Sequence, residues 1–257
     1  MLPNSVTSIG DNAFRYCSSL TSVTIYAPSL ADYDSYPFYD NSANQKIYVF
    51  SDCVDTYKTG WGTPYIEAIT LTANEGATGE YWTTYYNDMA DAKAPHDTQV
   101  FKASLDGTML TLTEIADGII TKGQGVVLKS ASASVLPLYS ASGSTADYSD
   151  NSLMGTMTSI ANPDNAYVLN KKESNGVGFY RLSASGEIGA NKAYLTYSGA
   201  DAREFFGFGE GETTSIQKAL ANDKEAGAWY SLDGRRLGGK PAEKGLYIHN
   251  GRKEVLK

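Results

Sequence analysis

The sequence predicts a mainly β protein in three parts. A phrase near the N-terminus recurs at an offset of 24 residues, which indicates a repeat. From residue 71 onward, short alternating segments are separated by Gly, Ser and Asn, and no long helical periodicity is present. We therefore expect the end of a repeat solenoid over residues 1–70, an antiparallel β-sandwich over 71–212, and a linker with a small C-terminal β-hairpin module over 213–257.

The repeat becomes visible when residues 14–25, "FRYCSSLTSVTI", are laid over residues 38–49, "FYDNSANQKIYV". Phe14 then falls on Phe38, and Val23 falls on Ile47. A period of 20 to 29 residues with one short strand per unit is the signature of a leucine-rich-repeat solenoid. Each unit contributes apolar residues to one inward ladder, which it cannot bury without its neighbours.

Cys17 falls on Asn41 in the same alignment. In leucine-rich repeats one turn position takes Asn or Cys, a small side chain that can face the backbone inside the coil. This structural interpretation is favoured over a reactive thiol, because no histidine that would lower the pKa is evident nearby. Cys53 lies in "SDCVDTYKTGW", where we expect a short helix after a last strand at Lys46–Phe50, with Asp52 as N-cap and Gly60 as the stop.

The segment "LPNSVTSIGDNAFRYCSSLTSVTI" resembles a unit of the BspA-like leucine-rich repeats found on bacterial surface proteins. The resemblance is strong over Leu2–Ile25 and fades over Tyr26–Ile69, as expected where a solenoid ends in atypical units. It implies a non-enzymatic protein at the outer cell surface or outside the cell. The implied function is adhesion to host extracellular matrix or cell-surface proteins. Fewer than three units are present, so we expect this chain to be the C-terminal part of a longer protein.

The middle of the chain contains a clear hairpin signal, "VFKASLDGTMLTLTE", in which two alternating runs flank Asp106-Gly107. Five further strand segments follow: "GVVLKS", "NAYVLN", "GVGFYRLSASGE", "KAYLTY" and "EFFGFGE". Such a series predicts an antiparallel sandwich. The segment "YSASGSTADYSDNS" between the first two is expected to be a long polar loop.

The C-terminal part contains Asp233-Gly234 and Asn250-Gly251, each between short alternating runs, which predicts two hairpins. We expect these two hairpins to pair with each other or to add strands to the sandwich. The segment "GLYIHNGRK" resembles C-terminal modules of proteins secreted by gut and mouth bacteria. In some relatives such modules are sorting signals read by the type IX secretion machinery. A structural role for residues 213–257 is the alternative.

Charge and composition exclude several classes of function. The formal net charge of −8 disfavours nucleic acid as a partner, because the phosphate backbone demands a basic face. No stretch approaches the roughly 18 consecutive apolar residues of a membrane span, so membrane attachment is expected only through export or anchoring.

Motifs for chemistry are also scarce. His96 and His249 are far apart in sequence, and neither Gly-x-Ser-x-Gly nor Cys-x-x-Cys occurs. We therefore predict no catalytic residue, no metal and no cofactor. A glycoside hydrolase with two facing carboxylates stays an alternative, because their separation is not visible in a sequence.

Two aromatic clusters are candidate binding sites. Tyr33, Tyr36 and Tyr39 surround Phe38, and Trp82, Tyr85 and Tyr86 form a second group. Exposed aromatic rings at this density can anchor a protein partner or stack on sugars. The alternative for both clusters is a place in the core. If the second cluster is exposed and coplanar, the sandwich is a carbohydrate-binding module, and glycans become the ligands.

Overall fold

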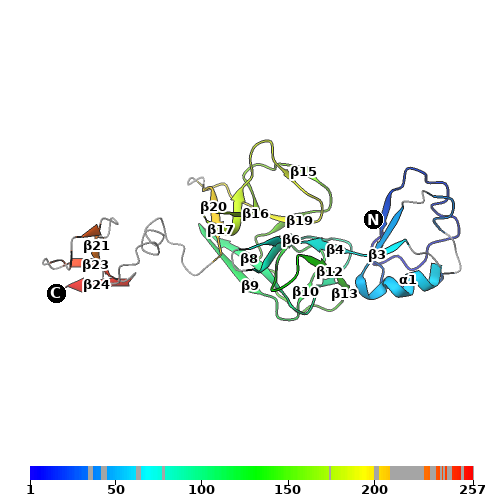
Figure 1. The fold of residues 1–257 in the computed structure, drawn as a ribbon, viewed down its shortest axis with the longest axis horizontal. Coiled ribbons are helices and arrows are strands. Elements are labelled where there is room, and N and C mark those ends of the chain that lie inside the picture. Colours follow the sequence, from blue (N-terminus) through cyan, green and yellow to red (C-terminus); the bar gives the residue numbers. More distant parts are fainter. Residues whose placement is uncertain are drawn as a thin grey trace. The chain divides into compact units, whose positions relative to one another are not determined.

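The protein is seen in a computed structural model (Figure 1). It describes residues 1–33, 37–41, 45–61, 65–76, 79–173, 175–199, 203–208, 229–231, 236–237, 239, 241, 245–249 and 252–256. The chain divides into two compact units, Met1–Phe208 and Gly209–Lys257. The regular structure of the described residues is mainly β-strand, with one α-helix among them, which agrees with the predicted β class. The predicted boundary at residue 70 falls within the first unit.

The N-terminal part is a parallel ladder with one short strand per repeat. Its strands are β1 (Ser22–Thr24), β2 (Lys46–Val49) and β3 (Ile66–Ala68), and Leu2 adds a parallel bridge to Ile25. Val23 pairs with Ile47 and Ile47 pairs with Ile66. All three side chains of this row are buried. The predicted inward ladder of apolar residues is therefore present, with the predicted 24-residue offset between β1 and β2.

The turn side of the repeats keeps the same offset. The rings of Phe14 and Phe38 stack with centroids 5.2 Å apart and planes 7° from parallel. The Phe14 N–H donates to the carbonyl of Pro37 at 2.8 Å. Offset stacking of aromatic rings adds to the free energy gained by burying them. The sequence alignment of Phe14 on Phe38 is confirmed.

The end of the ladder differs in detail from the prediction. The expected last strand is followed by one more parallel strand, β3, because Ile66 continues the buried row. A 3₁₀ turn, η1 (Ser51–Cys53), and helix α1 (Val54–Trp61) lie between β2 and β3. Cys53 therefore lies in a short helical segment, as predicted.

Neither predicted helix boundary holds. Phe50, not Asp52, is the residue before η1, and it makes no side-chain capping bond. Gly60 lies inside α1, which ends at Trp61. A Cβ atom at Gly60 would overlap the ring of Tyr33, so glycine is required here for close packing rather than for ending the helix.

A central antiparallel sheet follows, with strand order β5-β6-β11-β8-β9. Its strands are β5 (Asn74–Glu75), β6 (Tyr81–Tyr85), β11 (Val126–Ser130), β8 (Thr98–Asp106) and β9 (Met109–Glu114). Val126 and Leu128 belong to one hydrophobic core, and Val127 between them belongs to another. Because successive side chains of a strand point to opposite faces, this sheet is buried on both faces.

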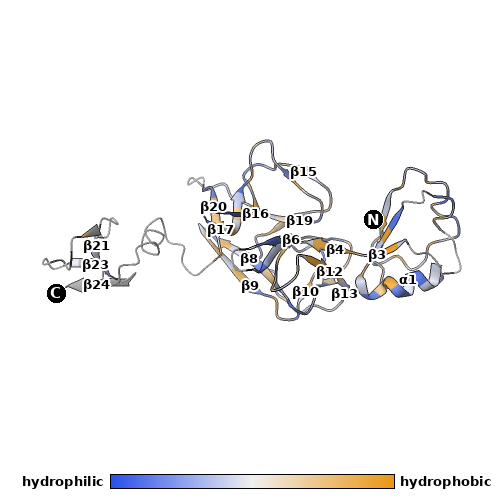
Figure 2. Cartoon of the chain, viewed as in Figure 1, coloured by the Kyte–Doolittle hydropathy of each residue, from blue (hydrophilic) through white to orange (hydrophobic). Residues whose placement is uncertain are grey.

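One core lies between the central sheet and the repeats. It includes residues of four small strands: β4 (Thr70–Thr72), β12 (Val135–Pro137), β7 (Ala92–Lys93) and β10 (Ile119–Ile120). A fifth short strand, β13 (Tyr139–Ser140), pairs with β7. The same core includes Ile25, Val49 and Tyr57 from the repeats. Figure 2 shows hydrophobic and hydrophilic segments next to each other along α1, as expected for a helix with one buried face.

The opposite face packs on a second antiparallel sheet of order β14-β19-β16-β17-β20. Its strands are β14 (Met154–Thr156), β19 (Lys192–Thr196), β16 (Ala166–Lys172), β17 (Gly176–Arg181) and β20 (Phe205–Gly207). A short pair, β15 (Ile160–Ala161) and β18 (Glu187–Ile188), lies beside it. Val127 of the central sheet shares a core with Phe179 and Leu195 of this sheet. All five segments predicted as strands contain strands.

The hairpin β8–β9 confirms the turn signal, with one shift in register. Asp106 pairs with Met109, so the two turn residues are Gly107 and Thr108. Gly107 has a φ angle of 57°, which glycine adopts without steric cost. The predicted polar loop over residues 139–152 is also largely free of regular structure, except that β13 pairs with β7 at its start.

The C-terminal unit contains a four-stranded antiparallel sheet of order β22-β21-β23-β24. The strands are β21 (Trp229–Tyr230), β22 (Arg236–Leu237), β23 (Gly245–His249) and β24 (Arg252–Leu256). The two predicted hairpins pair with each other through β21 and β23. The predicted turn residues Asp233-Gly234 and Asn250-Gly251 lie outside the described residues.

Asp52 joins the repeats to the β strands that follow. Its carboxylate accepts the Ser140 N–H at 2.9 Å and the Ser140 hydroxyl at 2.5 Å. Beside it, Ser51 N–H donates to the carbonyl of Leu138 at 2.7 Å, and Leu138 N–H donates to Ile69 at 2.9 Å. These hydrogen bonds hold η1 against β13. Those between Asp52 and Ser140 join residues 88 positions apart.

Replacing Asp52 by Ala is expected to lower the free energy of unfolding by about 1 kcal/mol, because two hydrogen bonds to a partly solvated carboxylate are lost. Urea unfolding followed by tryptophan fluorescence measures the change. Thr56→Ala, an exposed change on α1, is the matched control and should leave the midpoint almost unchanged. Equal midpoints for both variants would show that Asp52 carries no net stability.

Candidate interaction surface on the repeats

The repeat turns place an unusual side chain on the surface. Tyr16 and Asp40 are 24 residues apart and have nearly the same left-handed backbone, with φ angles of 58° and 57°. Aspartate tolerates this conformation, whereas a bulky aromatic residue rarely adopts it. The Tyr16 side chain is nevertheless 67% exposed. Burial in the core therefore does not compensate for the backbone strain at Tyr16.

Arg15 organises the surface around Tyr16. Its guanidinium carbon lies 4.5 Å from the centroid of the Tyr16 ring and 4.9 Å from that of Tyr39. Its Nη2 atom is 3.0 Å from the Asp40 carboxylate. This hydrogen bond raises the pKa of Arg15 above its ordinary value, so the guanidinium is charged across the physiological range. Tyr39 is 54% exposed. We call Arg15, Tyr16, Tyr39 and Asp40 the aromatic–arginine surface.

The first predicted cluster contributes one residue to this surface. Tyr39 lies in it, whereas Tyr33 packs edge-on against the rings of Tyr57 and Trp61 at 5.4 and 5.9 Å. The Tyr33 hydroxyl accepts the N–H of Leu30 at 2.9 Å. Tyr33 therefore packs against the C-terminal end of α1. Tyr36 lies outside the described residues.

The second predicted cluster does not form one exposed platform. Tyr85 is 1% exposed and lies in the core shared with the repeats, whereas Trp82 and Tyr86 pack on the opposite side of the strand. Burial raises the pKa of Tyr85 well above that of a free tyrosine. The predicted platform does not form because both faces of β6 pack against other parts of the protein. The number of aromatic residues in a segment does not reveal this packing.

The two remaining rings of that cluster, Trp82 and Tyr86, pack against neighbouring residues of the chain. Trp82 stacks on Phe208 with centroids 5.1 Å apart, and the Lys129 amine lies 5.1 Å from its ring centroid. Tyr86 packs so closely on Gly155 that a Cβ atom there would overlap the ring. Sugar stacking on these rings is therefore not supported by their surroundings.

Three residues of the aromatic–arginine surface escaped the sequence analysis: Arg15, Tyr16 and Asp40. The signal that could have found them was available, because the offset of 24 places Arg15 on Tyr39 and Tyr16 on Asp40. Residues at equivalent positions of neighbouring repeats lie side by side in a parallel ladder. Only the backbone angles, however, reveal that Tyr16 is strained.

The two cysteines are both free but differ in environment. Cys17 is exposed, so the prediction that its side chain faces the inside of the coil is wrong. Its N–H instead donates to Oδ1 of Asn41 at 2.8 Å, so the Asn of one repeat holds the backbone of the other. Cys53 is buried, and burial together with the nearby Asp52 carboxylate raises the pKa of its thiol to about 11.

The repeat geometry agrees with the comparison against known families. Residues 1–81 match a family model described as BspA type leucine rich repeat region (6 copies). The matched segment covers 81 of the 257 residues and supports a BspA-like leucine-rich repeat in this part of the chain. The match extends past β3 and includes β5, beyond the expected boundary at residue 70. No curated protein and no solved structure matches the chain significantly.

None of the helices in the described part of the chain is long and apolar enough to cross a membrane. The His, Cys, Asp and Glu side chains of the same part include no group of three or more placed to hold a metal ion. His249 stacks on Trp229 in the C-terminal unit, with centroids 4.2 Å apart.

The two thiols of the protein are expected to react at different rates. At pH 8 iodoacetamide should alkylate Cys17 of the folded chain while Cys53 stays unmodified, because a thiol with a pKa about 11 is almost entirely protonated and is also buried. Reaction of Cys53 should increase as the pH approaches 11. Peptide mass spectrometry measures both sites, and urea-unfolded protein serves as the fully reactive control. Equal rates in the folded chain would contradict the buried environment of Cys53.

Proposed function

We propose that this chain is part of a non-enzymatic adhesin, which binds other proteins through its BspA-type repeats at the cell surface or outside the cell. The family match supports a role in surface or protein–protein interaction. The observation that carries the proposal is the aromatic–arginine surface, where an exposed Tyr16 is held in a strained backbone conformation. Backbone strain of this kind clusters at functional sites, where it is part of the mechanism.

The surface has the composition of a binding hot spot. Tyrosine and arginine carry a disproportionate share of the energy of protein interfaces, because they bury a large area and make directional polar contacts. Arg15 is already fixed between two rings and a carboxylate. Its side chain therefore loses little conformational entropy when a partner covers it, which lowers the cost of association.

The chemistry of the surface suggests how a partner is held. The two tyrosine rings offer apolar faces with hydroxyl groups at their ends. A carboxylate or carbonyl group of the partner can accept from the guanidinium donors that Asp40 leaves free, since arginine has five donors. Host extracellular matrix or cell-surface proteins are the partners that we propose, as the BspA-like resemblance implies.

The remaining parts are proposed to serve this adhesin without chemistry of their own. The sheets up to Phe208 act as a spacer, and residues 213–257 act in export or anchoring, with a structural role as the alternative. Cys53, with its buried thiol and raised pKa, is poorly suited to act as a nucleophile. We propose no cofactor.

Binding of the full chain to an array of extracellular matrix and cell-surface proteins tests the proposal. Tyr16→Gly is the decisive variant, because glycine relieves the backbone strain while it removes the ring. We expect at least a tenfold weaker binding with unchanged or slightly higher thermal stability. Arg15→Ala should weaken binding by a similar factor.

Tyr65→Ala is the matched control, because Tyr65 is an exposed tyrosine of the repeats outside this surface. It should bind as the unmodified chain does. Wild-type binding by Tyr16→Gly and Arg15→Ala would refute the role of the surface, and the absence of any protein ligand on the array would refute the proposed function.

A further inference from the structure

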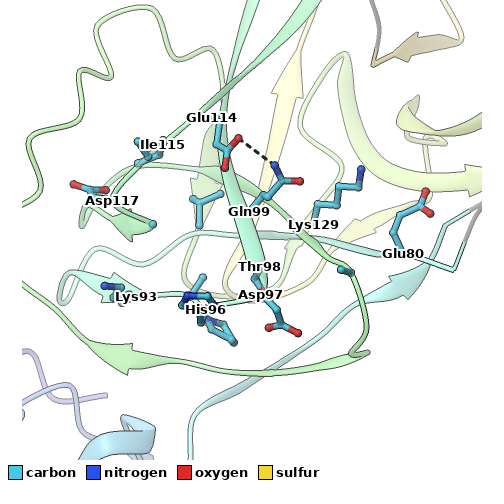
Figure 3. A pocket seen from close by; sticks show the side chains of 16 residues that line it. Glu80, Lys93, His96, Asp97, Thr98, Gln99, Glu114, Ile115, Asp117 and Lys129 are labelled. Atoms are coloured by element: carbon cyan, nitrogen blue, oxygen red, sulfur yellow. Dashed lines mark hydrogen bonds between the residues drawn. The ribbon is translucent and has the colours of Figure 1, made fainter.

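A polar cleft lies at the end of the hairpin β8–β9, away from the repeats' aromatic–arginine surface. It encloses about 690 Å³. Its walls are the loop 94–97 before β8 and the turn 115–118 after β9, which are joined by a bond from the Ala94 N–H to the carbonyl of Gly118 at 3.3 Å. Just after β9 ends, the Ile115 N–H donates a hydrogen bond to the carbonyl of Val100 at 2.8 Å. Figure 3 shows the side chains that line the cleft.

The lining is rich in groups that form hydrogen bonds. Its charged side chains are Glu80, Asp97, Glu114, Asp117, Lys93 and Lys129. Four carboxylates and two amines give a local charge of 2 − 4 = −2 with histidine neutral. This balance disfavours an anionic ligand, and the many polar groups of the lining disfavour a purely apolar one. A ligand that both donates and accepts hydrogen bonds fits the mixture best.

The polar groups are held in place and keep unused capacity. Gln99 Nε2 donates to Glu114 Oε2 at 3.1 Å, which is the dashed line of Figure 3. Asp97 accepts the Ser132 hydroxyl at 2.6 Å, and Asp117 accepts the Ile119 N–H at 2.9 Å. An ionised carboxylate accepts about four hydrogen bonds, so each of these groups can accept more.

Trp82 supports this lining from the side. Lys129 pairs in register with Gln99 on β8 and with Trp82 on β6, so the three form one row across the sheet. The Lys129 amine lies over the Trp82 ring, and Trp82 Nε1 donates to Glu80 Oε1 at 3.3 Å. Trp82 thus positions two charged side chains of the cleft instead of offering its own face to a ligand.

A second, independent observation concerns a buried hydroxyl in the lining. Thr98, which lines the cleft, is only 8% exposed. Its hydroxyl has no hydrogen-bond partner among the described residues. A buried hydroxyl without a partner is unfavourable, since it has lost its hydrogen bonds to water. A ligand group that reaches the base of the cleft would supply the missing bond.

We propose that this cleft binds a neutral saccharide. Each sugar hydroxyl is both a donor and an acceptor, so adjacent hydroxyls can donate to Glu114 or Asp97 and accept from Gln99 or Lys129. No net charge has to be neutralised. The site lies on the central sheet, and Glu80 is the one lining residue within the matched repeat segment, so the cleft is separate from the proposed protein-binding surface.

Saturation-transfer NMR of the full chain with maltotriose, cellotriose, xylotriose and chitotriose tests the proposal, followed by calorimetric titration of the saccharide that binds. Glu114→Ala and Gln99→Ala should each weaken binding at least tenfold. Both side chains are exposed, so the fold should be retained. Asp106→Asn, an exposed change at the other end of the same hairpin, is the control and should bind normally.

Thr98→Val separates binding from stability. Valine keeps the shape of the side chain but lacks the hydroxyl that is without a partner, so the melting temperature should not fall while saccharide affinity falls at least threefold. No signal from any of the four saccharides would overturn the proposal. Wild-type affinity in both Glu114→Ala and Thr98→Val would overturn it as well.

Discussion

The parallel register of the repeats, with its offset of 24 residues, is the constraint on which the N-terminal part depends. It stacks Phe14 on Phe38 and places Val23 beside Ile47 in the buried row. The same register brings the backbone of Cys17 to the side chain of Asn41. One repeat alone could bury none of these groups, so the ladder gains its stability between repeats. The aromatic–arginine surface is a consequence of this register, since its side chains come from two neighbouring turns.

The central sheet imposes the second constraint, because both of its faces are covered. Antiparallel sheets often leave one face to solvent, and a strand then alternates between apolar and polar residues. In β11 the three consecutive residues Val126, Val127 and Leu128 are all buried. The same covering explains why Tyr85 and Trp82 have different neighbours. Binding through this sheet is therefore expected at its ends and edges, where the polar cleft lies.

Local patterns predicted the elements well, whereas partners distant in sequence could not be predicted. The equivalence of Phe14 and Phe38 and the hairpin at Gly107 follow from spacing and turn chemistry. The local sequence predicts that Asp52 caps a helix, but its hydrogen-bond partner Ser140 is 88 residues away. The lining of the cleft is drawn from four separate segments of the chain, and no motif connects them. The burial of Tyr85 likewise depends on a core that repeats and sheets build together.

Tyr16 shows how stability and function can be separated in such a ladder. The equivalent residue of the next repeat, Asp40, adopts the same left-handed backbone with a side chain that tolerates it. The turn itself therefore does not require an aromatic residue. A strain of about 1–2 kcal/mol persists only where surrounding structure fixes the backbone, and the stacked rings of Phe14 and Phe38 provide that support two residues away. Since the Tyr16 ring is largely in solvent, what it gains from the fold is limited to Arg15. The protein partner that we propose would supply the contacts that the fold does not give to this ring.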